Sequence, residues 1–160
     1  MIKVLFVCMG NICRSPAGES IFRHMVKEEG LEDKIYVDSA GTISNHVGEC
    51  SDSRMIRHAE KRGYSMTHIA RQFNPIKDFR EFDYILVMDD ANYRDIIRFD
   101  IERQYTKKLH RMAEYSTLGI KDVPDPYYGG PEAFEHVLDL LENACRVLLE
   151  EVKIKIEQSA

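Results

Sequence analysis

A cysteine and an arginine separated by five residues stand near the start of the chain. Cys8 ends an apolar, strand-like run, and Arg14 opens a segment with helical periodicity. A loop between a strand and a helix directs its backbone N–H groups, together with the positive end of the helix, toward one point. An arginine there can bind two phosphate oxygens through its planar fork. The same field favours the thiolate of Cys8, which is the nucleophilic form of cysteine.

This spacing alone is weak evidence, because it arises often by chance. In the alternative interpretation, Cys8 fills space at a strand end and Arg14 makes a surface ion pair. The position between an apolar strand and a helix favours the functional interpretation. The residues expected to cradle a phosphate, with Arg14, are Met9, Gly10, Asn11, Ile12 and Cys13.

The elements that must position this loop follow from hydrophobic periodicity. Strand-like runs alternate with helical runs, which predicts a three-layer α/β domain with a mainly four-stranded parallel sheet flanked by helices. The site should lie at the carboxyl ends of the strands. Strands are expected at residues 3–7, 35–38, 84–88 and 108–112, and helices at 15–29, 52–62, 90–98 and 132–154.

Composition narrows the classes of function. A length of 160 residues suits one domain, residues 1–160. A net charge of −5 without a basic run argues against nucleic acid as a partner. No apolar stretch is long enough to cross a membrane, and the short first apolar run is not typical of a signal peptide. We therefore expect a cytoplasmic protein whose four cysteines are thiols.

The loop and several further segments resemble the low-molecular-weight protein tyrosine phosphatases. Residues 7–16, Val-Cys-Met-Gly-Asn-Ile-Cys-Arg-Ser-Pro, are similar to the signature of that family. The resemblance spans essentially the whole chain. It includes Asp38-Ser39, Thr67-His68-Ile69-Ala70-Arg71-Gln72, residues 82–89 and Asp125-Pro126-Tyr127-Tyr128-Gly129.

The resemblance implies a mechanism with three catalytic residues. Cys8 attacks phosphorus, Arg14 binds the phosphate, and Asp125 acts as general acid and then as general base. Asp125 lies between two prolines, which stiffen its loop, although an aspartate before proline is also common in ordinary turns. Ser15 can donate its hydroxyl to the Cys8 sulfur and stabilise it as a leaving group. No metal and no cofactor is expected.

Further residues are expected to support or border the site. In the family, the counterpart of Asn11 holds the loop with help from those of Ser39 and His68, although a lone histidine is more often solvated or satisfied in the core. Asp89 ends a strand and is expected in the same network. Cys13 is expected to form a reversible disulfide with Cys8 that protects it from oxidation.

The expected rim of the pocket has two sides. Tyr127 and Tyr128 are expected to stack against the substrate ring, although they could equally be half-buried loop aromatics. The opposite wall should come from residues 43–47. Many relatives carry an aromatic residue there, whereas this chain has Asn45 and His46.

The resemblance also implies partners. These are phosphotyrosine-containing proteins, with a tyrosine kinase among the candidates, and inorganic phosphate as product and inhibitor. A monomer is expected.

Four other functions fit the sequence less well. Arsenate reductases with this loop carry further cysteines near the third strand, and residues 87–91 contain none. Phosphoarginine phosphatases tend to have threonine at the position of Ile12 and to lack the paired tyrosines. A non-catalytic phosphotyrosine-binding module would be expected to have lost Cys8, Arg14 or Asp125. A zinc site is disfavoured by the loose cysteine spacing.

Overall fold

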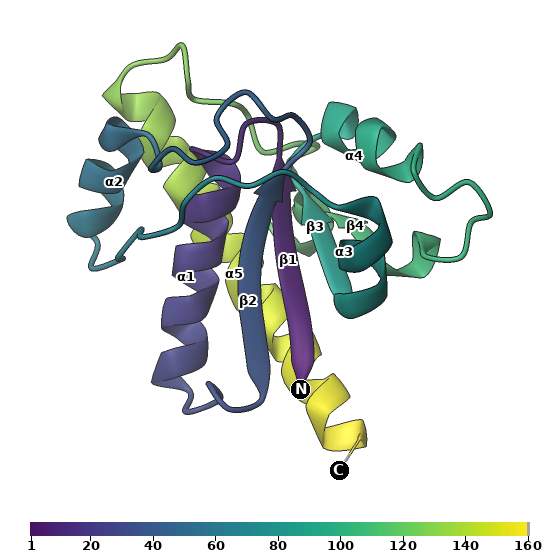
Figure 1. The fold of residues 1–160 in the computed structure, drawn as a ribbon. Coiled ribbons are helices and arrows are strands. Elements are labelled where there is room, and N and C mark those ends of the chain that lie inside the picture. The colour runs from purple at the N-terminus through teal and green to yellow at the C-terminus, as the bar shows by residue number, and fades with distance from the viewer. Residues whose placement is uncertain (160) are drawn as a thin grey trace.

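The computed structural model describes residues 1–159 and is built on a parallel sheet of four strands (Figure 1). The strand order is β2-β1-β3-β4, and every neighbouring pair is parallel. The predicted fold class is therefore confirmed. The strands are β1 (Ile2–Cys8), β2 (Ile35–Gly41), β3 (Tyr84–Val87) and β4 (Leu109–Arg111).

Helices cover both faces of the sheet. Each predicted helix is present, with ends that differ by up to four residues from the prediction. In Figure 1, α1 and α5 lie on one side of the sheet, and α3 and α4 on the other. The α-helices are α1 (Arg14–Glu28), α2 (Ser53–Glu60), α3 (Pro75–Glu81), α4 (Asp90–Ile97) and α5 (Pro131–Gln158), with 3-10 helices at Thr106–Lys108 and Met112–Tyr115.

The helix α3 was not predicted. It is short, and its start is set by local chemistry: the Asn74 side chain accepts hydrogen bonds from the backbone N–H groups of Ile76 and Lys77. Pro75 occupies the first turn, where its missing N–H costs nothing. The Asn-Pro pair is a recognisable sequence signal for this helix start.

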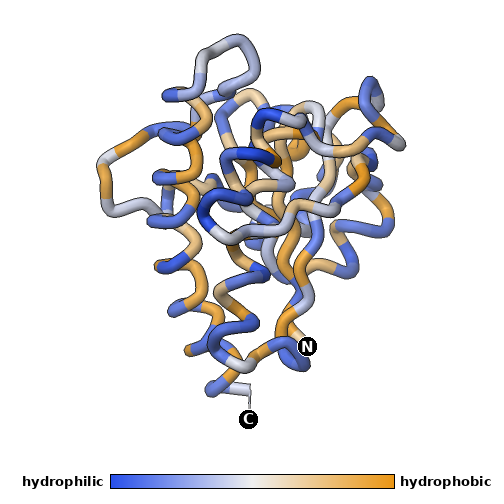
Figure 2. The backbone as a smooth tube through the Cα atoms, turned by 90° about the vertical axis from the view of Figure 1, so that its left-hand side faces the viewer, coloured by the Kyte–Doolittle hydropathy of each residue, from blue (hydrophilic) through white to orange (hydrophobic). Residues whose placement is uncertain are grey.

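The central strand β1 divides the interior into two apolar clusters. Val4 and Phe6 point into the cluster beneath α1 and α5, whereas Leu5 and Val7 point into the one beneath α3 and α4. Because both faces are covered, the strand is a continuous apolar run without alternation. In Figure 2 orange, hydrophobic segments run through the interior, and blue and orange alternate along the long C-terminal helix.

The sheet topology places a crevice beyond the carboxyl end of β1. The chain passes from β1 through α1 to β2, and the strands β3 and β4 lie on the other side of β1. Such a reversal of strand order leaves room for a ligand at that edge of the sheet. Among residues 1–159, no helix has the length and apolar character needed to span a bilayer.

Candidate active site

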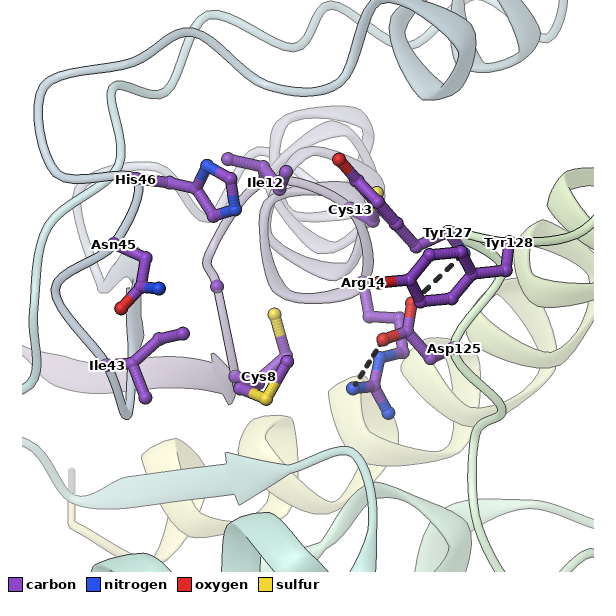
Figure 3. Close-up of a pocket in the computed structure, with 12 residues that line it drawn as sticks. Cys8, Ile12, Cys13, Arg14, Ile43, Asn45, His46, Asp125, Tyr127 and Tyr128 are labelled. Atoms are coloured by element: carbon purple, nitrogen blue, oxygen red, sulfur yellow. Dashed lines mark hydrogen bonds and ion pairs between the residues drawn. The ribbon is translucent and has the colours of Figure 1, made fainter.

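The loop between β1 and α1 forms the floor of a cavity at this crevice. The cavity has a volume of about 240 Å³, and Cys8 lies at its base with 3% of its surface exposed. Asp125 lies on one side and His46 on the other (Figure 3). The lining residues are Cys8, Met9, Gly10, Ile12, Cys13, Arg14, Ile43, Asn45, His46, Asp125, Tyr127 and Tyr128.

The end of β2 packs directly against this loop. Gly41 pairs with Cys8 in the strand register, and a Cβ atom on Gly41 would lie 2.7 Å from the carbonyl oxygen of Met9. Such a contact is too short for any side chain, so glycine is required for this approach of two backbones. The loop is thereby fixed against the sheet.

Asn11 organises the loop from within. It is buried and has a φ of 58°, a left-handed conformation that asparagine tolerates better than most residues. The backbone N–H of Arg71 donates to Asn11 Oδ1 at 3.0 Å, which fixes the orientation of the amide. Asn11 Nδ2 therefore donates, to Ser15 Oγ at 2.8 Å and to Ser39 Oγ at 3.0 Å.

These bonds direct the hydroxyl of Ser15 toward the nucleophile. Ser15 Oγ accepts from Asn11 and lies 3.0 Å from Cys8 Sγ. Its own proton is thus available to the sulfur, since the nearest alternative acceptor, Ala40 O, is 3.5 Å away. A hydroxyl placed in this way can stabilise a thiolate, both as the resting nucleophile and as a leaving group.

A buried acidic residue, Glu19, supports this network and was not predicted. It is 2% exposed, and its carboxylate accepts from Ser39 Oγ at 2.7 Å and lies 3.1 Å from His68 Nδ1. His68 Nε2 lies 2.8 Å from Asn11 Oδ1, which can only accept. The ring of His68 therefore lies between Asn11, which faces Nε2, and Glu19, which faces Nδ1.

The position of Glu19 carried a usable signal. Glu19 lies four residues after Ser15, so the two side chains share one face of the helix that follows the loop. The donor atoms of Glu19, Asp38 and His68 also lie close enough together to hold a metal ion. Because the Glu19 carboxylate already accepts from Ser39 and pairs with Arg23, the arrangement fits a hydrogen-bonded support better than a metal site.

Arg14 is held by two oxygen acceptors. Its Nη1 donates to Asp89 Oδ2 at 2.6 Å and to the carbonyl oxygen of Val123 at 3.0 Å. Asp89 also caps α4 by accepting from the backbone N–H of Asn92, so within the described residues it supports Arg14 and is not bonded to the network of Asn11 in which it was expected. Although burial opposes the charge, the pKa of Arg14 is raised because Cys8, Asp89 and Asp125 favour the cation.

Asp125 projects from a more exposed loop. Its side chain is 41% exposed and lies 3.7 Å from Arg14 Nη2. The backbone N–H of Tyr127 donates to Asp125 Oδ1 at 3.1 Å and fixes one carboxylate oxygen. At the end of this loop the backbone of Gly129 packs closely against the first turn of α5, because a Cβ on Gly129 would lie 2.6 Å from the Cβ of Ala133.

The two sides of the cavity mouth differ in character. Tyr127 and Tyr128 pack edge-to-face, with 36% and 96% of their surfaces exposed. Across the mouth, the ring of His46 lies over Gly10, and its Nδ1 is 3.1 Å from a carboxylate oxygen of Glu49. One wall is thus aromatic, and the other carries the polar Asn45 and His46 beside Ile43.

Cys13 lies beside the site as a free thiol. Burial raises its pKa, and the nearby Asp52 and Cys8 raise it further, so it is a protonated thiol at neutral pH. A protective disulfide with Cys8 stays a prediction. Cys145 is also free and fully buried on the apolar face of α5.

The match to a protein family decides how this arrangement is classified. The model of the family described as low molecular weight phosphotyrosine protein phosphatase matches residues 3–158. The chain belongs to the low molecular weight phosphotyrosine protein phosphatase family. A member from Gallus gallus with that name is 41% identical over 149 residues, which cover 92% of this chain and 94% of the relative.

Solved structures agree with this assignment. A protein tyrosine phosphatase from Entamoeba histolytica, crystallised with Hepes in its active site, superposes with a TM-score of 0.93 at 41% identity and covers 97% of this chain and 99% of that one. An arginine phosphatase from Drosophila also matches, with a TM-score of 0.87, 32% identity, and 95% and 98% coverage. Members of this fold therefore carry names with different substrates, so the fold alone does not decide which phosphoryl group is cleaved.

Proposed function

We propose that this phosphatase hydrolyses phosphotyrosine in proteins, and small aryl phosphates, through a cysteinyl-phosphate intermediate. The observation that carries the proposal is that a nucleophile, a phosphate-binding arginine and an acid line one cavity. Cys8 lies at its base beside the Ser15 hydroxyl at 3.0 Å, and Arg14 links the floor to Asp125.

In the first step, Cys8 Sγ attacks phosphorus while the bond from phosphorus to the tyrosyl oxygen breaks. Arg14 and the loop N–H groups stabilise the charge on the equatorial oxygens. A phenol has a pKa near 10, so its departure is assisted when Asp125 donates a proton to the leaving oxygen. The phosphoryl group is then bound to sulfur and the free tyrosine leaves.

In the second step, water attacks the phosphocysteine. Asp125, now ionised, accepts a proton from the water, and the Cys8 thiolate departs. Ser15 stabilises that thiolate through the hydroxyl that Asn11 orients. The step releases inorganic phosphate and restores the protonated Asp125. Every group needed is a side chain or backbone N–H of the chain, so the proposed mechanism requires no metal ion or cofactor.

The aromatic wall favours an aryl substrate. Tyr127 and Tyr128 border the mouth, where a substrate ring can stack against them. Phosphotyrosine-containing proteins are thus the proposed partners. Action as a monomer in the cytoplasm and inhibition by inorganic phosphate stay predictions.

The test compares phosphate release from p-nitrophenyl phosphate and from a phosphotyrosine peptide by wild type and Cys8→Ser. Wild type should cleave both esters in the presence of EDTA, and Cys8→Ser should be inactive because it lacks the thiolate. Phosphoarginine is offered in a parallel assay at the same concentration. Wild type that is inert on both esters, an active Cys8→Ser variant, or faster cleavage of phosphoarginine would contradict the proposal.

A further inference from the structure

Arg54, in the first turn of α2, connects the loop of residues 8–14, which forms the floor of the cavity, to the loop of residues 124–129, which carries Asp125. Its guanidinium binds Asp52, the residue that caps α2, with Nε at 3.1 Å from Oδ1 and Nη2 at 2.9 Å from Oδ2. The pKa of Asp52 is lowered, although burial opposes this, because Arg54 stabilises the carboxylate. The fork of Arg54 is therefore anchored on its own helix.

The same guanidinium reaches the loop that carries Asp125. Arg54 Nη2 donates to the carbonyl oxygen of Tyr127 at 3.0 Å. Its Cζ lies 5.4 Å from the centre of the Tyr127 ring and 4.8 Å from that of Phe134 on α5. Both distances are within the range of an attractive cation–π contact.

The anchor of Arg54 is also tied to the phosphate-binding loop. The backbone N–H of Asp52 donates to the carbonyl oxygen of Ile12 at 2.8 Å. A continuous path of short contacts thus runs from Ile12 through Asp52 and Arg54 to Tyr127. Tyr127 in turn donates its N–H to Asp125.

Few polar contacts hold the loop of residues 124–129, although Pro126 is buried and Val123, just before the loop, is bonded to Met88 and Arg14. In the part of the chain that the structure describes, this segment shares one hydrogen bond with another element, and Arg54 donates it. The remaining polar contact is the Asp125–Arg14 pair at 3.7 Å, and Asp125 is 41% exposed. Arg54 thus supplies the hydrogen bond that holds this loop at Tyr127, two residues after Asp125.

We propose that Arg54 is a positioning residue that holds the loop of Asp125 over the phosphate-binding loop, so that proton donation to the leaving group depends on it. The inference rests on the proposed function, because it assigns Asp125 the role of acid. Arg54 itself is not expected to touch the reacting atoms. A lysine at this position keeps the charge but loses the fork that joins Asp52 to Tyr127.

The experiment measures kcat/KM of wild type, Arg54→Gln and Arg54→Lys on two aryl phosphates. This parameter reports the chemistry up to the first irreversible step, in which the aryl group leaves. Arg54→Gln should lose about tenfold or more on phenyl phosphate, the effect expected for one hydrogen bond from a charged donor. The loss should be much smaller on p-nitrophenyl phosphate, whose phenol is more acidic and needs less protonation.

A double-mutant cycle with Asp125→Asn distinguishes an effect of Arg54 on the position of Asp125 from a general loosening of the structure. If Arg54 acts through Asp125, Arg54→Gln should add little to the loss already caused by Asp125→Asn. The inhibition constant of inorganic phosphate should stay unchanged, since the phosphate-binding loop is intact. Arg57→Ala is the matched control, because Arg57 is exposed on the same helix and has no side-chain hydrogen bond to residues 124–129 in the described part of the chain.

Several outcomes would overturn the inference. These are equal losses on both esters, full additivity with Asp125→Asn, or weaker phosphate inhibition, any of which would make Arg54 a structural residue only. Thermal unfolding checks that Arg54→Gln is folded. If that variant does not fold, the same measurements on Arg54→Lys carry the test. The activity of Arg54→Lys should lie between those of wild type and Arg54→Gln. Failure of the proposed function would look different, because wild type itself would then be inert on both esters.

Discussion

The loop of residues 8–14 and the loop of residues 124–129 face the same cavity but are held in different ways. The first is buried except at Met9 and Gly10, and its asparagine alone takes part in four hydrogen bonds, to Ser15, Ser39, His68 and the backbone of Arg71. The second is largely exposed and shares one hydrogen bond with another described element. The proposed phosphate-binding loop is thus preorganised by many contacts, whereas the loop of the proposed acid is held by few.

This difference follows from what each loop must do. Charge that develops on a phosphoryl group is stabilised best by donors that do not reorganise during the reaction. A carboxyl group that first gives and then takes a proton must remain accessible to a leaving group and to water. Exposure of Asp125 is consistent with that requirement. Variants in the two loops should therefore fail in different ways.

Among variants that keep the Cys8 nucleophile, the largest effect is expected from Asp125→Asn. It should lower the rate on phenyl phosphate by about 10²- to 10⁴-fold, the usual contribution of a general acid. The inhibition constant of inorganic phosphate and the melting temperature should change little, because the exposed side chain makes few contacts. Steady-state kinetics and thermal unfolding check this. A large loss of phosphate affinity would show that the two loops are not independent.

A smaller loss of rate, with a loss of stability, is expected from Asn11→Ala. The variant removes the amide that joins Ser15, Ser39 and His68 and leaves alanine at a positive φ. We expect about 100-fold lower kcat/KM and roughly 3 kcal/mol lower unfolding free energy, since buried partners become unsatisfied. Urea unfolding and phosphate inhibition measure both. If phosphate affinity is retained, the preorganised cradle does not depend on Asn11.

The smallest effect on rate but a clear pH dependence is expected from Glu19→Gln. Burial alone would raise the pKa of Glu19. The pKa nevertheless lies below its ordinary value of 4.5, because His68, Arg23 and Ser39 stabilise the carboxylate. A depressed folded-state pKa means that the stabilisation is complete above the unfolded pKa and is lost as the pH falls through the folded one.

At pH 7, Glu19→Gln should therefore be less stable than wild type by about 3 kcal/mol. The difference should shrink as the pH falls below 4.5. Urea unfolding from pH 3 to pH 7 measures it. Glu28→Gln on the exposed face of α1 is the control and should change the unfolding free energy by less than about 0.5 kcal/mol. If the difference in unfolding free energy between wild type and Glu19→Gln does not vary with pH, the charge of Glu19 does not stabilise the fold.

Much of the fold could be predicted because local patterns and packing agree. The apolar run of β1 and the apolar face of α5 are strong signals, and both elements extend slightly beyond the prediction. The strand β2 continues through Ser39, Ala40 and Gly41, which have little strand propensity. It persists because β1 supplies hydrogen-bond partners up to Cys8, an effect of tertiary pairing that propensity does not contain.

The sequence by itself determined the chemistry: a thiol and an arginine at fixed spacing between a strand and a helix, and an aspartate between prolines. Only the tertiary structure decided which charged groups support them. Glu19 meets His68 across 49 positions of the chain, and Arg54 meets Tyr127 across 73. Contacts over such separations depend on how α1, α2 and the loop before α5 pack on the sheet. No local periodicity encodes that packing.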